Sequence, residues 1–245
     1  MNKKLLTLLG ICAALLLVAY IGLNFFLGSV VKAGVNRFGP RITQTKVELS
    51  GAQLSPLSGS GTLTGLSVGN PPGWNAEKAF YLGQVRVAVK PFSIFGDHIV
   101  INEVFIDHPE FVYETKIVAS NIGDLLKNIE AATGGGKDRP TAENGKPVKF
   151  EVKHFRMQNG TVTVGFGPTA LKLPMPPIEL NDLGTKEGGI TPDQLTFAVM
   201  RSVTPSIIAA TAQAAGQIGT TGGAAALEGV KKTGEAIKGI FGGKK

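Results

Sequence analysis

The sequence predicts a mainly β protein with an N-terminal transmembrane helix, an antiparallel sheet, one short helix in the middle of the domain and helices at the C-terminus. Three observations predict this fold class: an uncharged apolar run near the N-terminus, alternation of apolar and polar residues through the middle of the chain, and a change of period near residue 191. The predicted parts are an anchor at 1–30, a β domain at 31–190 and an Ala/Gly-rich, basic helical tail at 191–245.

The predicted anchor is an uncharged run from Leu5 to Leu27 that follows Lys3 and Lys4. A helix of this length spans roughly 35 Å at about 1.5 Å per residue, which is enough to cross a bilayer. A cleaved signal peptide is the alternative, but the run exceeds the about 7–15 apolar residues of such a peptide and no A-x-A-like site follows it. The lysine pair predicts a cytoplasmic N-terminus, so we expect the domain on the far side of the membrane.

Composition narrows the function classes. Hydrophobic residues make up 43% of the chain and charged residues 18%, so the soluble part is able to bury a core and is not disordered. The net charge of +7 suits either anionic lipid or nucleic acid, and the anchor favours lipid. Cys12, the single cysteine, lies in the apolar run, which excludes a disulfide within the chain. An outward-facing domain without disulfides favours a bacterial source.

A period of two dominates from Lys46 to Val164 and predicts strands with one apolar and one polar face. The phase changes between Leu63 and Leu66, which predicts a β-bulge at Gly65. The apolar positions that we expect on the inner face are Val47, Leu49, Leu63, Val85, Val87, Val89, Ile101, Ile106, Phe111 and Tyr113.

One helix interrupts the predicted strands. Asn121 is expected to cap it, and its apolar face comprises Ile122, Leu125, Leu126 and Ile129. Glycines and mixed charges at about 133–147 predict a flexible loop after it. Further on, Pro174, Pro176 and Pro177 restrict residues 171–190 to an edge strand or an extended strap.

Thr191 and Pro192 predict the start of a C-terminal helix that stops or kinks at Pro205. At the end of the chain, apolar and basic residues separate onto two sides of a helix, as in helices that lie on a membrane surface. The alternative is a solvated tail or a helix packed on its own domain. The membrane-surface candidates of this tail are Ile237, Phe241, Lys231 and Lys238.

Trp74, the sole tryptophan, follows a rigid Asn70-Pro-Pro-Gly turn. It is the remaining membrane-surface candidate, since tryptophan favours membrane interfaces, and it would also suit a lipid entrance. The alternative is that it caps the protein core.

No motif predicts catalysis. Asp97-His98 and Asp107-His108 have no third imidazole at ligand spacing, so we expect turn residues and no metal. The glycines before Lys137 lack the remaining residues of a phosphate loop, and no G-x-S-x-G motif occurs. We therefore expect no catalytic residue and no cofactor, and hence no enzyme.

Several phrases occur in a characteristic order after the apolar run: VELSGAQLSPLSGSGTLTGL at 47–66, VGNPPGW at 68–74, LGQVRV at 82–87, DHIVINEVFI at 97–106, PEFVYE at 109–114 and NIGDLL at 121–126. Together they resemble the N-terminal region of the AsmA-like family of Gram-negative envelope proteins, over residues of about 1–130. The likeness is one of order and phrasing, with no single diagnostic residue.

This resemblance implies an inner-membrane anchor and a periplasmic domain at 31–190 with a strongly bent sheet, whose hydrophobic concave face holds lipid acyl chains. The inner-face residues named above would then line an apolar groove. Acyl chains gain about 0.8 kcal/mol for each CH₂ group removed from water, so such a groove needs no polar motif. We expect a lipid-binding or lipid-transfer protein of envelope homeostasis, with membrane phospholipids and envelope proteins as partners and no nucleic acid. The alternative is a non-enzymatic scaffold or assembly factor for envelope proteins.

Overall fold

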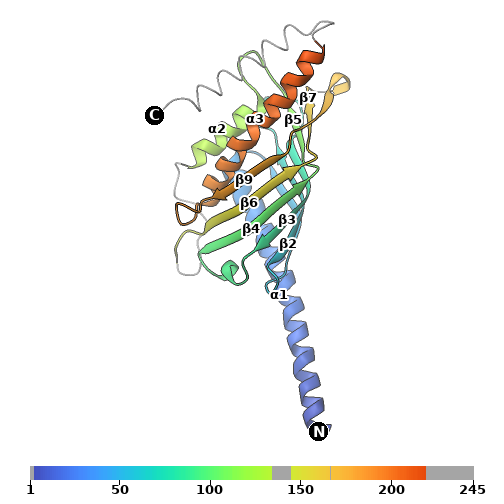
Figure 1. Cartoon of the computed structure of the whole chain (residues 1–245), viewed down its shortest axis with the longest axis vertical. Coiled ribbons are helices and arrows are strands. Elements are labelled where there is room, and N and C mark those ends of the chain that lie inside the picture. Colours follow the sequence, from blue (N-terminus) through green and yellow to red (C-terminus); the bar gives the residue numbers. More distant parts are fainter. Residues whose placement is uncertain (1–2, 134–144, 166, 219–245) are drawn as a thin grey trace.

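A computed structural model describes residues 3–133, 145–165 and 167–218. Within these residues the chain forms a nine-stranded, mostly antiparallel sheet and three α-helices (Figure 1). The fold is therefore mixed helix and sheet, which corrects the expectation of a mainly β protein. The difference arises because helix α1 (Lys3–Thr43) extends beyond the predicted anchor and helix α3 (Pro192–Ile218) continues past Pro205.

Helix α1 (Lys3–Thr43) leaves the body as an apolar stalk and then continues along the sheet (Figure 1). Its first half exposes large apolar side chains and is long and apolar enough to cross a membrane. Its second half packs on strand β1, where the side-chain oxygen of Asn36 accepts a hydrogen bond of 2.6 Å from the Leu49 backbone N–H. The predicted boundary at residue 30 thus falls inside one helix, close to the point where α1 meets the sheet.

The strands are β1 (Val47–Leu54), β2 (Ser60–Gly69), β3 (Lys78–Val89), β4 (His98–Asp107), β5 (Glu110–Tyr113), β6 (Lys149–Gln158), β7 (Thr161–Val164), β8 (Leu171–Pro174) and β9 (Ile178–Leu183). Some of them are segments of one longer strand. Ile106 of β4 pairs with Val85, and Phe111 of β5 pairs with Phe80 in the same unbroken register. Strands β6 and β7 continue each other in the same way, as do β8 and β9.

The sheet therefore runs from β1 through β2 and β3 to the long strands β4–β5, β6–β7 and β8–β9. Strands β4–β5 and β6–β7 are parallel, which corrects the expectation of a fully antiparallel sheet. Helix α2 (Asn121–Thr133) lies in the connection between them, because a parallel neighbour requires the chain to cross back to its starting end. Strands β8 and β9 form the outer edge, as predicted for residues 171–190; Pro174 ends β8, and Pro176 and Pro177 lie between the two strands.

An irregular line crosses the sheet. By register, this line joins neighbouring residues of adjacent strands: Gly65, Gly83, His108 and Asn159. Three of them have positive φ angles, which are 64° at Gly65 and 54° at both His108 and Asn159. The parity of the buried residues changes across this line. The predicted β-bulge at Gly65 is nevertheless wrong, because Thr64 pairs with Gln84 and Leu66 with Leu82 in one unbroken register, and the register of β2 shifts only between Val68 and Gly69. The Asn159 amide also donates a 2.8 Å hydrogen bond to Asp107, which is the main cause that lowers the pKa of that carboxyl.

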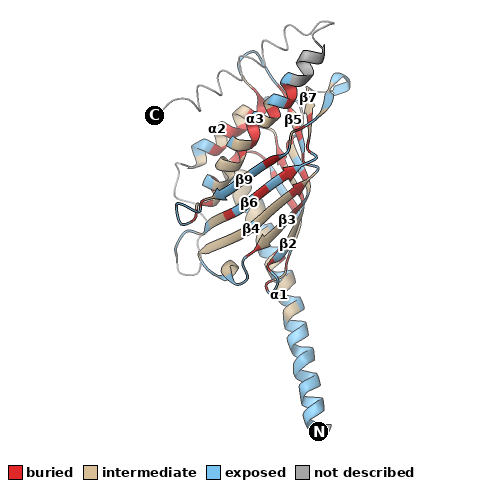
Figure 2. Cartoon of the chain, in the orientation of Figure 1, coloured by how far each residue is buried: buried red, intermediate tan, exposed pale blue. Residues whose placement is uncertain are grey.

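Helices α2 and α3 (Pro192–Ile218) cover one face of the sheet, and Figure 2 shows the buried residues between them and the strands. Helix α3 begins at Pro192 as predicted, where the Gln194 side chain accepts a 3.0 Å hydrogen bond from the Thr191 N–H. It continues through Pro205 and does not stop there. Its apolar window also has the length and composition of a membrane span, but 33% of that window is buried, and Met200, Val203 and Ile207 belong to the protein core.

Two glycines of α1 provide a matched test of its packing. A Cβ atom on Gly28 would lie 2.1 Å from the Ala52 carbonyl oxygen, whereas one on Gly34 would meet nothing within 4 Å. We expect Gly34→Ala to raise the midpoint of thermal unfolding of the full chain in detergent, because alanine is favoured over glycine in a helix by about 1 kcal/mol. Gly28→Ala should lower it, since the helix must move off β1. Equal shifts for the two variants would show that α1 does not pack on β1.

Candidate functional site

The residues predicted to line an open groove lie in the interior of the protein. Val47, Leu49, Val85, Val89, Ile106, Phe111 and Tyr113 are at most 6% exposed, and Leu63, Val87 and Ile101 are partly buried against the core (Figure 2). Most of this set packs in one cluster with Leu125 and Ile129 of α2 and with Val203 and Ile207 of α3. The expectation of an open groove at these positions is therefore wrong for the described residues, because helices of the same chain supply the second layer.

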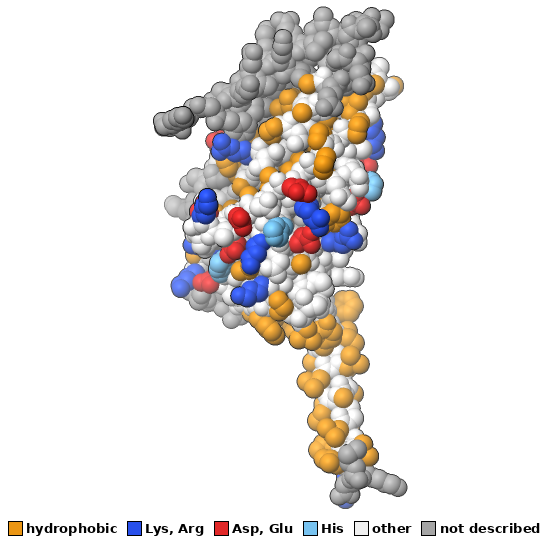
Figure 3. Space-filling view, in the orientation of Figure 1, with side chains coloured by type: hydrophobic (Ala, Val, Ile, Leu, Met, Phe, Trp, Pro, Cys, Tyr) orange, Lys and Arg blue, Asp and Glu red, His pale blue; other side chains and the backbone are white. Residues whose placement is uncertain are grey.

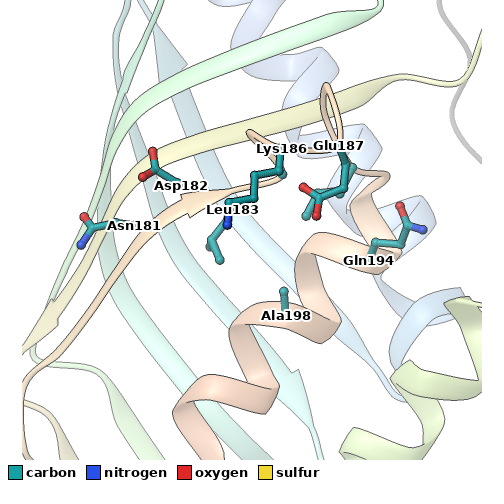
Figure 4. Close-up of a pocket in the computed structure, with 9 residues that line it drawn as sticks. Asn181, Asp182, Leu183, Lys186, Glu187, Gln194 and Ala198 are labelled. Carbon is teal, nitrogen blue, oxygen red and sulfur yellow. The ribbon is translucent and has the colours of Figure 1, made fainter. Parts of the chain in front are cut away.

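A cleft of about 630 Å³ remains between β9 and the first turns of α3 (Figure 4). Leu183, Ile190 and Ala198 are its apolar lining residues. Asn181, Asp182, Lys186, Glu187 and Gln194 give it a polar rim, and Lys186 and Glu187 come from the loop after β9. Its volume lies in the range of small-molecule sites, about 300–1,000 Å³. No local pattern in the sequence predicts this cleft, since the strand and the helix that line it meet only in the folded protein.

The opposite face of the sheet is left open by the helices, and it carries the charged side chains that gather over the middle of the body in Figure 3. Register places Arg86, Phe105, Arg156 and Glu179 in one row across β3, β4, β6 and β9. The guanidinium carbons of Arg86 and Arg156 lie 4.5 and 5.4 Å from the centroid of the Phe105 ring. An aromatic ring is thus held between two arginines, and we call Arg86, Phe105 and Arg156 the Arg–Phe–Arg stack.

Further polar contacts fix this stack. Arg156 donates a 3.0 Å hydrogen bond from Nε to the Glu103 carboxylate, and a second guanidinium nitrogen binds the same oxygen. His154, which pairs with Glu103 by register, makes a 2.9 Å hydrogen bond with Asn181. Exposed ion pairs and cation–π contacts contribute only about 0.2–1 kcal/mol each, so these contacts mainly restrict the side chains. The sequence analysis did not single out Phe105 or Arg156, because their alignment with Arg86 depends on the register between distant strands.

Trp74 lies in the connection between β2 and β3, at the end of the sheet away from the β1–β2 turn. Its indole N–H donates a 3.2 Å hydrogen bond to Asp124 of α2, and the Lys116 ammonium lies 4.6 Å from its ring centroid. The exposed half of α1 leaves the body at the opposite end of the sheet (Figure 1). Trp74 thus lies at the end of the sheet opposite the exposed half of α1, and its role as a membrane-surface residue stays a prediction.

A buried polar network fixes the same end of the sheet. The carboxylate of Glu114, which is 4% exposed, accepts hydrogen bonds of 3.1 and 2.7 Å from the backbone N–H groups of Asn75 and Ala76. Asn121 binds the backbone of Val112 and Glu114. The prediction that Asn121 caps α2 is therefore wrong. Ser120 is the cap, since its hydroxyl accepts a 3.0 Å hydrogen bond from the Gly123 N–H. Each oxygen of the Glu114 carboxylate accepts two hydrogen bonds from Asn70, Asn75 or Ala76, which supports a structural role for the network.

The described residues contain no group of three or more His, Cys, Asp or Glu side chains that could hold a metal ion. In the irregular line between β4 and β5, the His108 imidazole lies 3.1 Å from the Asp107 carboxylate, and the His108 backbone N–H donates a 3.1 Å hydrogen bond to the Gln158 carbonyl. This is the position of a turn-like residue within a strand. The tail candidates Ile237, Phe241, Lys231 and Lys238 lie outside the described residues, as does most of the predicted loop at 133–147.

A scan of protein-family models finds no match to this chain. A search of curated proteins finds no relative either.

The Glu114 network predicts a large difference between two carboxylates that lie four residues apart. Glu114→Ala should lower the free energy of unfolding by about 2–5 kcal/mol, because it leaves several buried donors without an acceptor. Glu110→Ala is the matched control, since Glu110 is exposed and pairs only with Lys172, at 3.3 Å. We expect that variant to stay within about 0.5 kcal/mol of the parent in denaturant unfolding. A Glu114 variant as stable as the control would refute the structural role of the network.

Proposed function

We propose that this protein is a non-enzymatic scaffold or assembly factor of the bacterial envelope. In this proposal α1 spans the inner membrane once and the sheet domain lies in the periplasm, where its open face binds an envelope protein. The Arg–Phe–Arg stack is the observation that supports it best. Arginine and aromatic residues are enriched at protein interfaces, and a stack already held by Glu103 loses little side-chain entropy on binding.

The membrane anchor is supported by the exposure of α1. Leu16, Phe25 and Phe26 are 71%, 73% and 63% exposed and belong to a continuous apolar surface. A surface of this size on a protein in water would drive aggregation, whereas in a bilayer it would contact apolar acyl chains. Lys3 and Lys4 at its start favour a cytoplasmic N-terminus.

Two features favour the scaffold proposal over lipid transfer in a central groove. The apolar face that would hold acyl chains already holds α2 and α3. Lipid transfer there would require α3 to leave the sheet and the sheet to bend strongly into an open trough. The scaffold proposal requires no such change, because the stack already lies on the open face.

Crosslinking in cells tests the scaffold proposal. A photoreactive amino acid at Thr62, which is in the same cross-strand row as Arg86 and Phe105, should give one discrete protein adduct of the full chain. Arg86→Ala and Phe105→Ser should each reduce that adduct several-fold, because they remove stack side chains without touching the core. Lys172→Ala, an exposed cation at the sheet edge, is the control and should leave the adduct unchanged. Adducts to lipid alone, or an adduct indifferent to the stack, would contradict the proposal.

Lipid binding stays as a second candidate function because of the cleft between β9 and α3. Leu183, Ile190 and Ala198 offer an apolar surface to part of an acyl chain, and Lys186 on the rim offers a cation to a phosphate. A cleft of this size would hold one lipid tail and not a continuous file of lipids. It therefore supports binding of single phospholipids rather than a bridge between membranes.

The lipid candidate is tested by filling the cleft. The full chain, purified in detergent, should copurify with phospholipid detectable by mass spectrometry, and Ala198→Trp should reduce the bound lipid several-fold because indole occupies the cleft. Ala209→Trp is the matched control, since Ala209 lies exposed on the same helix. Absence of phospholipid from the parent protein, or equal lipid content in both variants, would remove this candidate.

A further inference from the structure

We infer that the base of the sheet domain inserts into the membrane surface through the tips of two loops, so that the domain is docked on the bilayer and does not hang free on its stalk. The residues that carry this contact are Leu57, Phe92 and Phe95, here called the basal tips. The inference rests on the proposed membrane span of α1 and adds a second membrane contact to it.

The basal tips come together beside the stalk. Leu57 lies in the turn between β1 and β2, and Phe92 and Phe95 lie in the connection between β3 and β4. The two connections adjoin, because the Val89 N–H donates a 2.6 Å hydrogen bond to the Gly59 carbonyl. Figure 3 shows hydrophobic side chains at the base of the body, where the apolar stalk leaves it.

A direct contact between the stalk and the turn sets the depth of the tips. The Tyr20 hydroxyl lies 2.9 Å from the hydroxyl of Ser55, the residue that follows β1. From Leu5 to Tyr20 a helix rises by about 23 Å, whereas the hydrocarbon core of a bilayer is about 30 Å thick. If the span begins at Leu5, after the two lysines, the hydrocarbon continues past Tyr20. Ser55 and the turn that follows it must then reach the membrane surface.

The exposed side chains at the tips of these loops are large and apolar, as insertion into a bilayer requires. Leu57, Phe92 and Phe95 are 65%, 65% and 56% exposed, so most of each apolar side chain is not packed within the described residues. Phe92 also has a left-handed backbone with φ of 66°, which is unfavourable for a bulky residue. No burial within the described residues offsets this strain. Insertion of the ring among acyl chains would offset it, because removing the ring from water is favourable.

A lipid bilayer is the occupant that the structure favours, because the tips continue the apolar surface of α1. The chain also provides an internal comparison. Ile117 and Val118 are 79% and 78% exposed in a tight turn at the opposite end of the sheet, beyond the reach of the same membrane. The residues at the two ends of the sheet are therefore similar in exposure and differ in their predicted depth in the membrane.

Depth-dependent fluorescence quenching tests the inference on the full chain. In a Cys12→Ser background, Leu57, Phe92, Phe95, Ile117, Val118 or Leu15 is replaced singly by cysteine and labelled with a small fluorophore. Each protein is reconstituted in vesicles of phosphatidylethanolamine and phosphatidylglycerol, with iodide on both sides of the membrane. We expect the basal labels to be quenched by lipids that carry a nitroxide near the head of the acyl chain. Quenching by iodide should be several-fold weaker there than at Ile117 and Val118.

The outcomes separate this inference from the proposed anchor. Basal labels as accessible to iodide as those at Ile117 and Val118, with the Leu15 label quenched by lipid, would overturn the docking and leave the anchor intact. Basal labels shielded from both quenchers would mean that protein covers them, which also overturns the inference. A Leu15 label quenched by iodide would show that α1 is not in the membrane, and the docking would fall with it.

Discussion

Burial of the sheet's inner face beneath helices of the same chain is the constraint on which the rest of the structure depends. A buried apolar side chain contributes about 1.5–3 kcal/mol, so a continuous apolar face is not left to water when α2 and α3 are available to cover it. Ile122, Leu125 and Ile129 provide one helix surface, and Met200, Val203 and Ile207 provide the other. Because this face is closed, the surfaces left for interaction are the open face, the cleft beside β9 and the base of the domain.

The two edges of the sheet are protected by different means. Along β1, α1 lies close enough for Asn36 to bind the backbone of Leu49, and Gly28 makes the close approach to Ala52 possible. At the other edge, prolines in and between β8 and β9 remove backbone donors, which opposes pairing with another strand. A protein partner would therefore meet side chains of the open face more readily than a free strand edge. This agrees with a proposal based on the Arg–Phe–Arg stack.

The same helix relates the membrane proposal to the fold. Helix α1 is continuous from Lys3 to Thr43, so the part that would cross the bilayer and the part that packs on β1 are one rigid body. A hinge between anchor and domain is thus missing within the described residues. The domain would be held at a fixed height and orientation, with the basal tips at the membrane surface and the end that carries Trp74 and Glu114 away from it.

Local sequence patterns were enough to predict the apolar helix, most of the strands, the edge position of residues 171–190, the change of buried face near Gly65 and the start of α3. Each of these follows from residue periodicity, proline chemistry or glycine conformation. It also identified most inner-face residues, since a period of two sorts the faces of a strand. What packs against that face is known only from the folded chain. An apolar pattern is the same whether lipid or helix covers it, and the parallel pairing after α2, the role of Ser120 as cap and the Arg–Phe–Arg row all depend on contacts between residues far apart in the chain.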